Sequence, residues 1–316
     1  MEEQNNKKQT IKKIIKLVGK AVSILSILFV IRAIYKLGFD FSNIDNWPIF
    51  ILVVIICVLI KTGTVFLSGS AWYGWLALFT GKKDKHKEAV AVYAKANIGK
   101  YLPGNVMHYV ERNLFAGKLG MSQKKLAAAS VLEVLTLVSV AFIMAVVVSA
   151  SQLKIALHKV GESYKAMIAL VIALGILFVA VVFFVFRKKI KQFLEDVSPK
   201  ELLLTVLRNM FLDGMVLFLL GSVMVVLYCY MGGTFELQTA AKIISGYVIA
   251  WVLGFVVPGA PGGVGVREIV ILLLLESVIG GGLVTTLSIT HRLITIIGDF
   301  LAYVLRLALV PAKQKE

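Results

Sequence analysis

The run WVLGFVVPGAPGGVGVRE, Trp251 to Glu268, interrupts a long apolar segment with two prolines and four glycines between Pro258 and Gly265. Proline stops a helix and glycine permits a sharp turn, so the run predicts that one helix ends and another begins at an angle. Backbone groups freed by such a break are tolerated at membrane depth only when they are buried in protein or line a wet cavity. The pair Arg267–Glu268 directly after the break would be costly there, which makes it a candidate site. The alternative is a surface loop between two spanning helices, with the pair at the lipid headgroups.

The composition places the chain in a membrane. Of its 316 residues, 59% are hydrophobic and only 16% are charged, which is typical of an integral membrane protein. A net charge of +16 would indicate nucleic acid as a partner of a soluble protein. Here the Lys and Arg residues lie mostly in loops beside apolar runs, so membrane topology and anionic headgroups explain the charge, and we expect no nucleic-acid partner.

The sequence predicts neither a metal site nor a cofactor. His108 and His291 are single histidines without the spacing of a zinc site, and no GxxxxGK[ST] nucleotide-binding motif occurs. Cys57 and Cys229 lie within apolar runs, and we interpret both as packing residues.

The Pro-Gly break occurs twice at the same spacing from an arginine. LPGN at residues 102–105 precedes Arg112, as VPGA at residues 257–260 precedes Arg267. Each break follows two long apolar runs and precedes one more, so the chain reads as two copies of one unit. Repeat one covers about residues 14–150 and repeat two about residues 164–311. Pro/Gly-interrupted segments in matching positions point to a transporter-like site at the repeat interface.

Loop charges favour an inverted repeat. If each broken pair enters and leaves on one side of the membrane, each repeat has three spanning helices, and the second repeat is inverted. Lys and Arg then gather on the side of the N-terminus, which agrees with the positive-inside rule. If one or both pairs crossed fully, the RKKIK loop or the C-terminal tail would lie outside. We therefore predict an all-α polytopic protein of the cell membrane with both termini in the cytoplasm and two opposed re-entrant hairpins whose tips approach each other near the midplane. The six expected spans are 17–37, 47–79, 122–150, 164–186, 199–231 and 283–310.

Charged residues in or beside the apolar segments are the candidate lipid-binding residues. Arg112 and Arg267 would hold a lipid phosphate through their forked guanidinium groups. Glu133 and Arg292 lie at comparable depths and are expected to pair across the pseudo-two-fold axis, and Asp213 could pair with either arginine. The acids Glu111, Glu133 and Glu268 would hold a headgroup amine or neutralise the arginines. The hairpin backbone would add N–H donors; its residues are Pro103, Gly104, Pro258, Gly259, Pro261, Gly262, Gly263 and Gly265.

Several of these motifs resemble one family. LPGN followed by ERN, the segment Gly117 to Glu133, the segment PGAPGGVGVRE and the HR at His291–Arg292 resemble the transmembrane region of lysylphosphatidylglycerol synthases. In the full-length relatives a cytosolic transferase domain adds lysine to phosphatidylglycerol, and the membrane region moves the product between leaflets. Because the chain ends at Glu316, we expect it to lack that domain. The resemblance therefore implies lipid translocation and not lysyl transfer itself.

Three functions stay open at this point. The first is a flippase or scramblase for a phosphate-bearing lipid, such as an aminoacylated phosphatidylglycerol. The second is the membrane part of a phosphatidylglycerol lysyltransferase system, the activity that family membership alone would assign. The third is an assembly factor for an envelope enzyme. The expected partners are membrane lipids with an anionic or aminoacylated headgroup and, in the second case, a separate lipid-modifying enzyme.

Overall fold

The computed structural model describes residues 44, 46–81, 84–101, 107–117, 120–159, 197–256 and 261–309, together with Ala180, Phe184 and Arg187. All regular structure in these residues is helical. The expected span 17–37 lies outside the described residues, as does the span 164–186 apart from Ala180 and Phe184.

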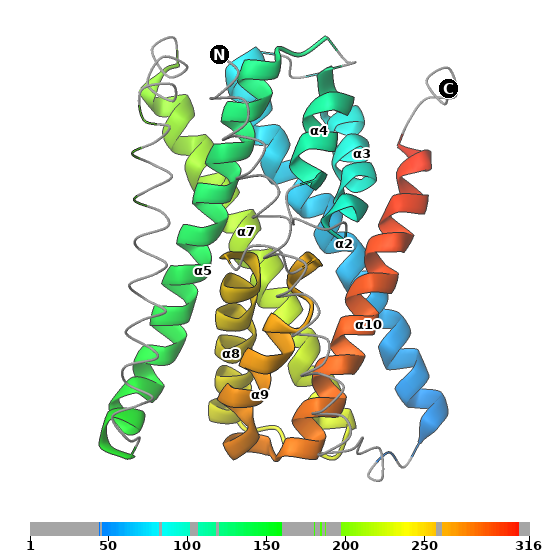
Figure 1. Cartoon of the computed structure of the whole chain (residues 1–316), viewed down its shortest axis with the longest axis vertical. Helices are drawn as coiled ribbons and strands as arrows, with labels where there is room; N and C mark the ends of the chain where they lie inside the picture. The colour runs from blue at the N-terminus through cyan, green and yellow to red at the C-terminus, as the bar shows by residue number, and fades with distance from the viewer. Residues whose placement is uncertain are drawn as a thin grey trace, which may run out of the picture.

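Four long helices run along most of the height of the molecule (Figure 1). They match four of the six expected spans: α2 (Trp47–Thr80), α5 (Gln123–Lys159), α7 (Pro199–Tyr230) and α10 (Gly281–Leu305). Helix α2 begins where the Asn46 side chain accepts a hydrogen bond from the Ile49 backbone N–H at 3.1 Å, and it ends at Gly81, whose φ of 69° is left-handed. Five described helices, these four and α8, are long and apolar enough to cross a membrane.

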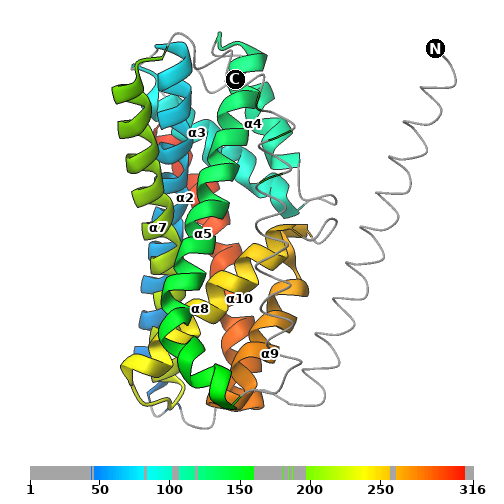
Figure 2. The ribbon, with the colours of Figure 1, turned by 90° about the vertical axis from the view of Figure 1, so that its left-hand side faces the viewer.

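Both predicted breaks separate a pair of helices. The first pair is α3 (His86–Ala96), continued by the short helix η1 (Asn97–Tyr101), and α4 (Met107–Gly117). The second is α8 (Leu237–Val256), followed by the short helix η2 (Pro261–Gly263), and α9 (Val266–Ile279). Figures 1 and 2 show each pair confined to one half of the molecule, and η1 contacts η2 where the tips meet. Each predicted break therefore separates two helices, and the tips of the two pairs meet; that the pairs are re-entrant in a membrane stays a prediction.

The connections sort to two ends, as the loop charges predict. One end of the molecule holds the C-termini of α2 and α10 and the N-termini of α3 and α5 (Figure 1). This is the end that the sequence predicts to lie in the cytoplasm. The other end of the molecule holds the start of α2, the connection between α7 and α8, and the turn from α9 into α10. The two helix pairs, called hairpins from here on, therefore lie in opposite halves of the molecule with their tips toward each other.

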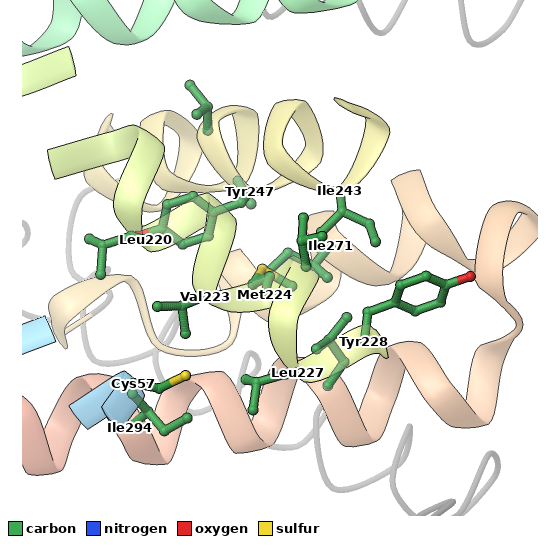
Figure 3. Close-up of a cluster of buried hydrophobic side chains, with 14 of the residues drawn as sticks. Cys57, Leu220, Val223, Met224, Leu227, Tyr228, Ile243, Tyr247, Ile271 and Ile294 are labelled. Atoms are coloured by element: carbon green, nitrogen blue, oxygen red, sulfur yellow. The ribbon is translucent and has the colours of Figure 1, made fainter. Parts of the chain in front are cut away.

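The core lies where α7 and α8 pack against α2, α9 and α10 (Figure 3). Met224, Leu227 and Ile243 are fully buried, and Cys57 is only 1% exposed, which confirms its packing role. Other apolar side chains face outward: Leu52 on α2 and Phe211 on α7 are 56% and 70% exposed. An apolar outer surface of this kind is suited to contact with lipid tails.

Candidate functional site

A cavity of about 120 Å³ lies where the two hairpin tips meet. Its walls come from both hairpins and from the long helices α2, α5, α7 and α10. Six charged side chains line it, and four of them are cationic: Lys61, Lys100, Glu133, Arg267, Arg292 and Asp299. Most of the wall is otherwise aromatic or apolar.

Asp299 on α10 is the most heavily hydrogen-bonded carboxylate in the cavity wall. Its Oδ1 accepts from Lys61 Nζ at 2.7 Å and from Asn97 Nδ2 at 2.8 Å. Its Oδ2 accepts from Tyr101 Oη at 2.6 Å and lies 2.6 Å from Lys100 Nζ. Four donors satisfy both carboxylate oxygens, and three of the four belong to η1. Asp299 therefore fixes the tip of the first hairpin to α10 and α2.

The close approach of α10 to α2 depends on Gly298. A Cβ at this position would lie 2.5 Å from Cγ and 2.9 Å from Cβ of Lys61. The Thr62 hydroxyl also donates to the Gly298 carbonyl at 3.2 Å. Glycine thus lets the Lys61 stem pass α10 and reach Asp299.

Arg267 lies in a cradle of two glycines beyond the second break. A Cβ on Gly254 would lie 2.5 Å from Cγ of Arg267, and one on Gly263 would lie 2.7 Å from its Nε. Its guanidinium sits over the Trp251 ring, 5.7 Å from the centroid. Arg267 makes no ion pair with another described residue, and its Nε has no hydrogen-bond partner. A half-buried guanidinium that faces a cavity and has no ion pair among the described residues is well placed to bind an anion.

Arg292 and Glu268 connect α10 to the start of α9. Arg292 Nη1 donates to the Gly262 carbonyl at 3.0 Å, and its Nε lies 3.8 Å from Glu268 Oε1. The other Glu268 oxygen accepts from the Gly265 backbone N–H at 2.5 Å and so caps α9. The predicted pair Arg267–Glu268 is thus divided: the acid caps a helix, while the arginine faces the cavity.

Arg112 is buried directly behind the cavity wall, next to the lining residues Glu133, Tyr93 and Tyr109. Its Nη1 donates to Glu133 Oε1 at 3.0 Å, and its Nη2 contacts Glu133 Oε2 and donates to the Ser130 hydroxyl at 3.0 Å. Its guanidinium also lies 4.5–5.0 Å from three aromatic ring centroids, those of Trp72, Tyr93 and Tyr109. Arg112 is 1% exposed, and both of its terminal nitrogens contact side chains of α5, so it is engaged in joining α4 to α5, although its Nε has no hydrogen bond.

Two of the expected pairings are wrong. Glu133 pairs with Arg112 and not with Arg292, because α4 packs directly on α5 within the first half. Asp213 forms no ion pair with another described residue, and its Oδ2 has no hydrogen bond. The two arginines that match in sequence therefore differ in environment: Arg112 is paired and Arg267 is not.

The hairpin backbone is described only in part. Pro103, Gly104, Pro258 and Gly259 lie outside the described residues. Pro261 begins η2, and Gly262, Gly263 and Gly265 have φ values of 57°, 74° and 83°. These left-handed values explain why the second break is rich in glycine. Glu111 is half-buried on α4 beside Gly99, where a Cβ would lie 2.6 Å from its Oε2.

Sequence reasoning did not select Lys61, Lys100, Tyr101 or Asn97. Lys61 carried a usable signal, since it is a single charge inside the apolar helix α2. The η1 residues carried none, because their role depends on where the tip meets α10. Within the described ranges, no three His, Cys, Asp or Glu side chains gather as a metal site would require.

Comparison with known proteins places the chain in a family. A search of curated proteins finds no match. The family described as "Lysylphosphatidylglycerol synthase TM region" matches residues 16–302, which includes every helix of both hairpins and the whole cavity wall. The family supports a lipid-related role in the membrane, and the five long apolar helices agree with a multi-pass membrane protein. The chain belongs to the lysylphosphatidylglycerol synthase transmembrane-region family.

Proposed function

We propose that this protein moves a phosphate-bearing lipid between the leaflets of the cell membrane, with the headgroup passing through the cavity between the hairpin tips. The carrying observation is Arg267, a cavity-lining guanidinium without an anionic partner among the described residues. Arginine is suited to phosphate because its planar fork matches two phosphate oxygens.

The charge balance of the site supports an anionic ligand. Lys61 and Lys100 share one carboxylate, so this cluster keeps one positive charge. Arg267 adds a second, whereas Arg112 and Arg292 each have an acidic partner. Two positive charges without anions are costly in a low-dielectric setting, and a bound phosphate would neutralise them.

The hairpin arrangement supports access from either side. In this proposal both helix pairs are re-entrant, one from the cytoplasm and one from outside, so that each closes the cavity toward one leaflet. Irregular backbone at the two breaks would then be shielded from lipid by the opposing tip. Phosphatidylglycerol and its aminoacylated form are the first lipids to test, given the family.

Arg267→Gln is expected to reduce lipid exchange at least about tenfold, because a charge-assisted phosphate contact is lost. The protein is reconstituted in liposomes with NBD-labelled phosphatidylglycerol or lysyl-phosphatidylglycerol. Loss of inner-leaflet fluorescence on adding membrane-impermeant dithionite then measures the exchange. The matched control is Arg208→Gln, which removes an exposed arginine on α7 outside the cavity and should leave the rate unchanged.

Two outcomes would contradict the proposal. One is no exchange above empty liposomes from well-folded wild-type protein with either lipid, which would favour an assembly role. The other is a normal rate in Arg267→Gln protein.

Gly254→Ala is expected to impair exchange without removing any charge. The added methyl would occupy the position of the Arg267 side chain, whose Cγ lies 2.5 Å from the ideal Cβ, and would push the guanidinium out of place. We expect a several-fold loss of the dithionite-measured rate. Gly214→Ala on α7 is the control, since its Cβ would make only an ordinary 3.5 Å contact with Val140, and an equal loss there would refute the cradle.

A further inference from the structure

The two lysines that share Asp299 differ in placement. Lys61 lies on the long helix α2 with a side chain only 8% exposed, and it contacts a residue of another long helix. Lys100 lies on η1, at the hairpin tip, and its side chain is 23% exposed in the cavity wall. Both lysines line the cavity, but Lys61 is held in the packing of the long helices, whereas Lys100 is the more exposed of the two to the space where a ligand would sit.

Asp299 does not need both cations. One carboxylate is neutralised by one ammonium group, and Lys61 supplies that at 2.7 Å. Asn97 and Tyr101 add neutral donors at 2.8 and 2.6 Å. If Lys100 left, Asp299 would keep a cation and two further hydrogen bonds. Lys100 also contacts the Asn97 side chain, at 3.3 Å from its Oδ1, and is otherwise oriented toward the cavity.

We propose that Lys100 is a headgroup-binding residue that exchanges Asp299 for the lipid phosphate. In the empty cavity Asp299 serves as an internal anion that holds Lys100. When a phosphate enters, Lys100 turns to it and joins Arg267, while Lys61 remains on Asp299. This step rests on the proposed function, since it assigns a second phosphate ligand in the same cavity.

The exchange also links ligand binding to the first hairpin. The ion pair between Lys100 and Asp299 is one of the three contacts through which η1 side chains reach Asp299 on α10. Its replacement by a phosphate contact loosens the tip from α10 on the side where it meets η2. A headgroup would thereby weaken the contact that closes the cavity around it.

A double-mutant cycle tests the exchange. The affinity of purified protein for dioctanoyl phosphatidylglycerol in detergent micelles is measured by isothermal titration for wild type, Lys100→Gln, Asp299→Asn and the double variant. Lys100→Gln is expected to weaken binding roughly tenfold. Asp299→Asn is expected to tighten it several-fold, because Lys100 loses its internal competitor. The tightening should be much smaller in the double variant, where there is no Lys100 to release and only Lys61 loses its anion.

Additive effects would overturn the proposal. If Asp299→Asn tightens binding equally with and without Lys100, the Asp299 carboxylate acts only by electrostatic repulsion of the phosphate and not by holding Lys100. Unchanged affinity in Lys100→Gln would likewise refute it, and this variant should fold because Asp299 keeps Lys61. Lys95→Gln on α3, an exposed lysine outside the cavity, is the control for loss of a positive charge.

The same titrations separate this inference from the proposed function. Wild-type protein that binds no lipid would remove both. Binding that is lost in Arg267→Gln but unaffected by Lys100 and Asp299 would remove the exchange alone. A third outcome is that Lys100→Gln weakens and Asp299→Asn tightens the binding of inorganic phosphate but not of the lipid. That result would show that the lipid is not the ligand of Lys100.

Discussion

Glu133→Ala is expected to lower the free energy of unfolding by about 3–5 kcal/mol, the usual cost of leaving one partner of a buried ion pair alone. Arg112 would stay at a position that is only 1% exposed, with the Ser130 hydroxyl as its remaining hydrogen-bond acceptor among the described residues. The rings of Trp72 and Tyr93 would offset part of the cost through cation–π attraction. Unfolding in mixed micelles of dodecylmaltoside and SDS gives the measurement.

Asp213→Asn is the matched control, because Asp213 is also a buried acid. Its Oδ2 has no hydrogen bond, and it forms no ion pair with another described residue. Removing the Asp213 charge should therefore leave stability unchanged or raise it. A loss of equal size in both variants would show that any change at this depth unfolds the protein and that the Arg112–Glu133 pair has no special weight.

The sequence predicted the helices and their breaks well because these depend on local chemistry. Apolar length predicts α2, α5, α7 and α10, and the prolines and glycines of residues 257–265 predict the turn before α9. Loop charge predicted which ends of the helices lie together, since insertion sorts Lys and Arg to one side. Each of these signals can be read within one segment.

The charge pairs could not be read in this way. The matching spacing of Arg112 and Arg267 favoured equivalent roles, yet Arg112 has Glu133 within reach on α5, and the position of Arg267 has no such acid among its described neighbours. Lys61 and Asp299 are 238 positions apart in sequence and meet only through the packing of α2 on α10. Local patterns thus located the charged residues, and tertiary packing decided which of them are neutralised.

Gly298→Ala is expected to destabilise the protein by about 1–3 kcal/mol through overpacking, with a further loss as Lys61 is pushed away from Asp299. The new methyl would meet Cγ and Cβ of Lys61 at 2.5 and 2.9 Å and the Val58 carbonyl oxygen at 3.2 Å. A backbone carbonyl and a buried lysine stem leave little room to adjust, so α10 would have to move away from α2. Such a shift would also draw Asp299 from the η1 donors.

Gly63→Ala tests whether steric contact, rather than loss of a helical glycine, causes the effect. Gly63 lies on the same helix as Lys61, and a Cβ there would meet nothing within 4 Å. Alanine should raise stability there by about 1 kcal/mol, since it favours the helix interior over glycine. Opposite signs for the two variants, measured by the same micellar unfolding, would confirm that Gly298 is the contact through which α2 and α10 bring Lys61 to Asp299. If Gly298→Ala were as stable as wild type, α10 would have to tolerate separation from α2, and the Lys61–Asp299 pair could not be what fixes the first hairpin tip.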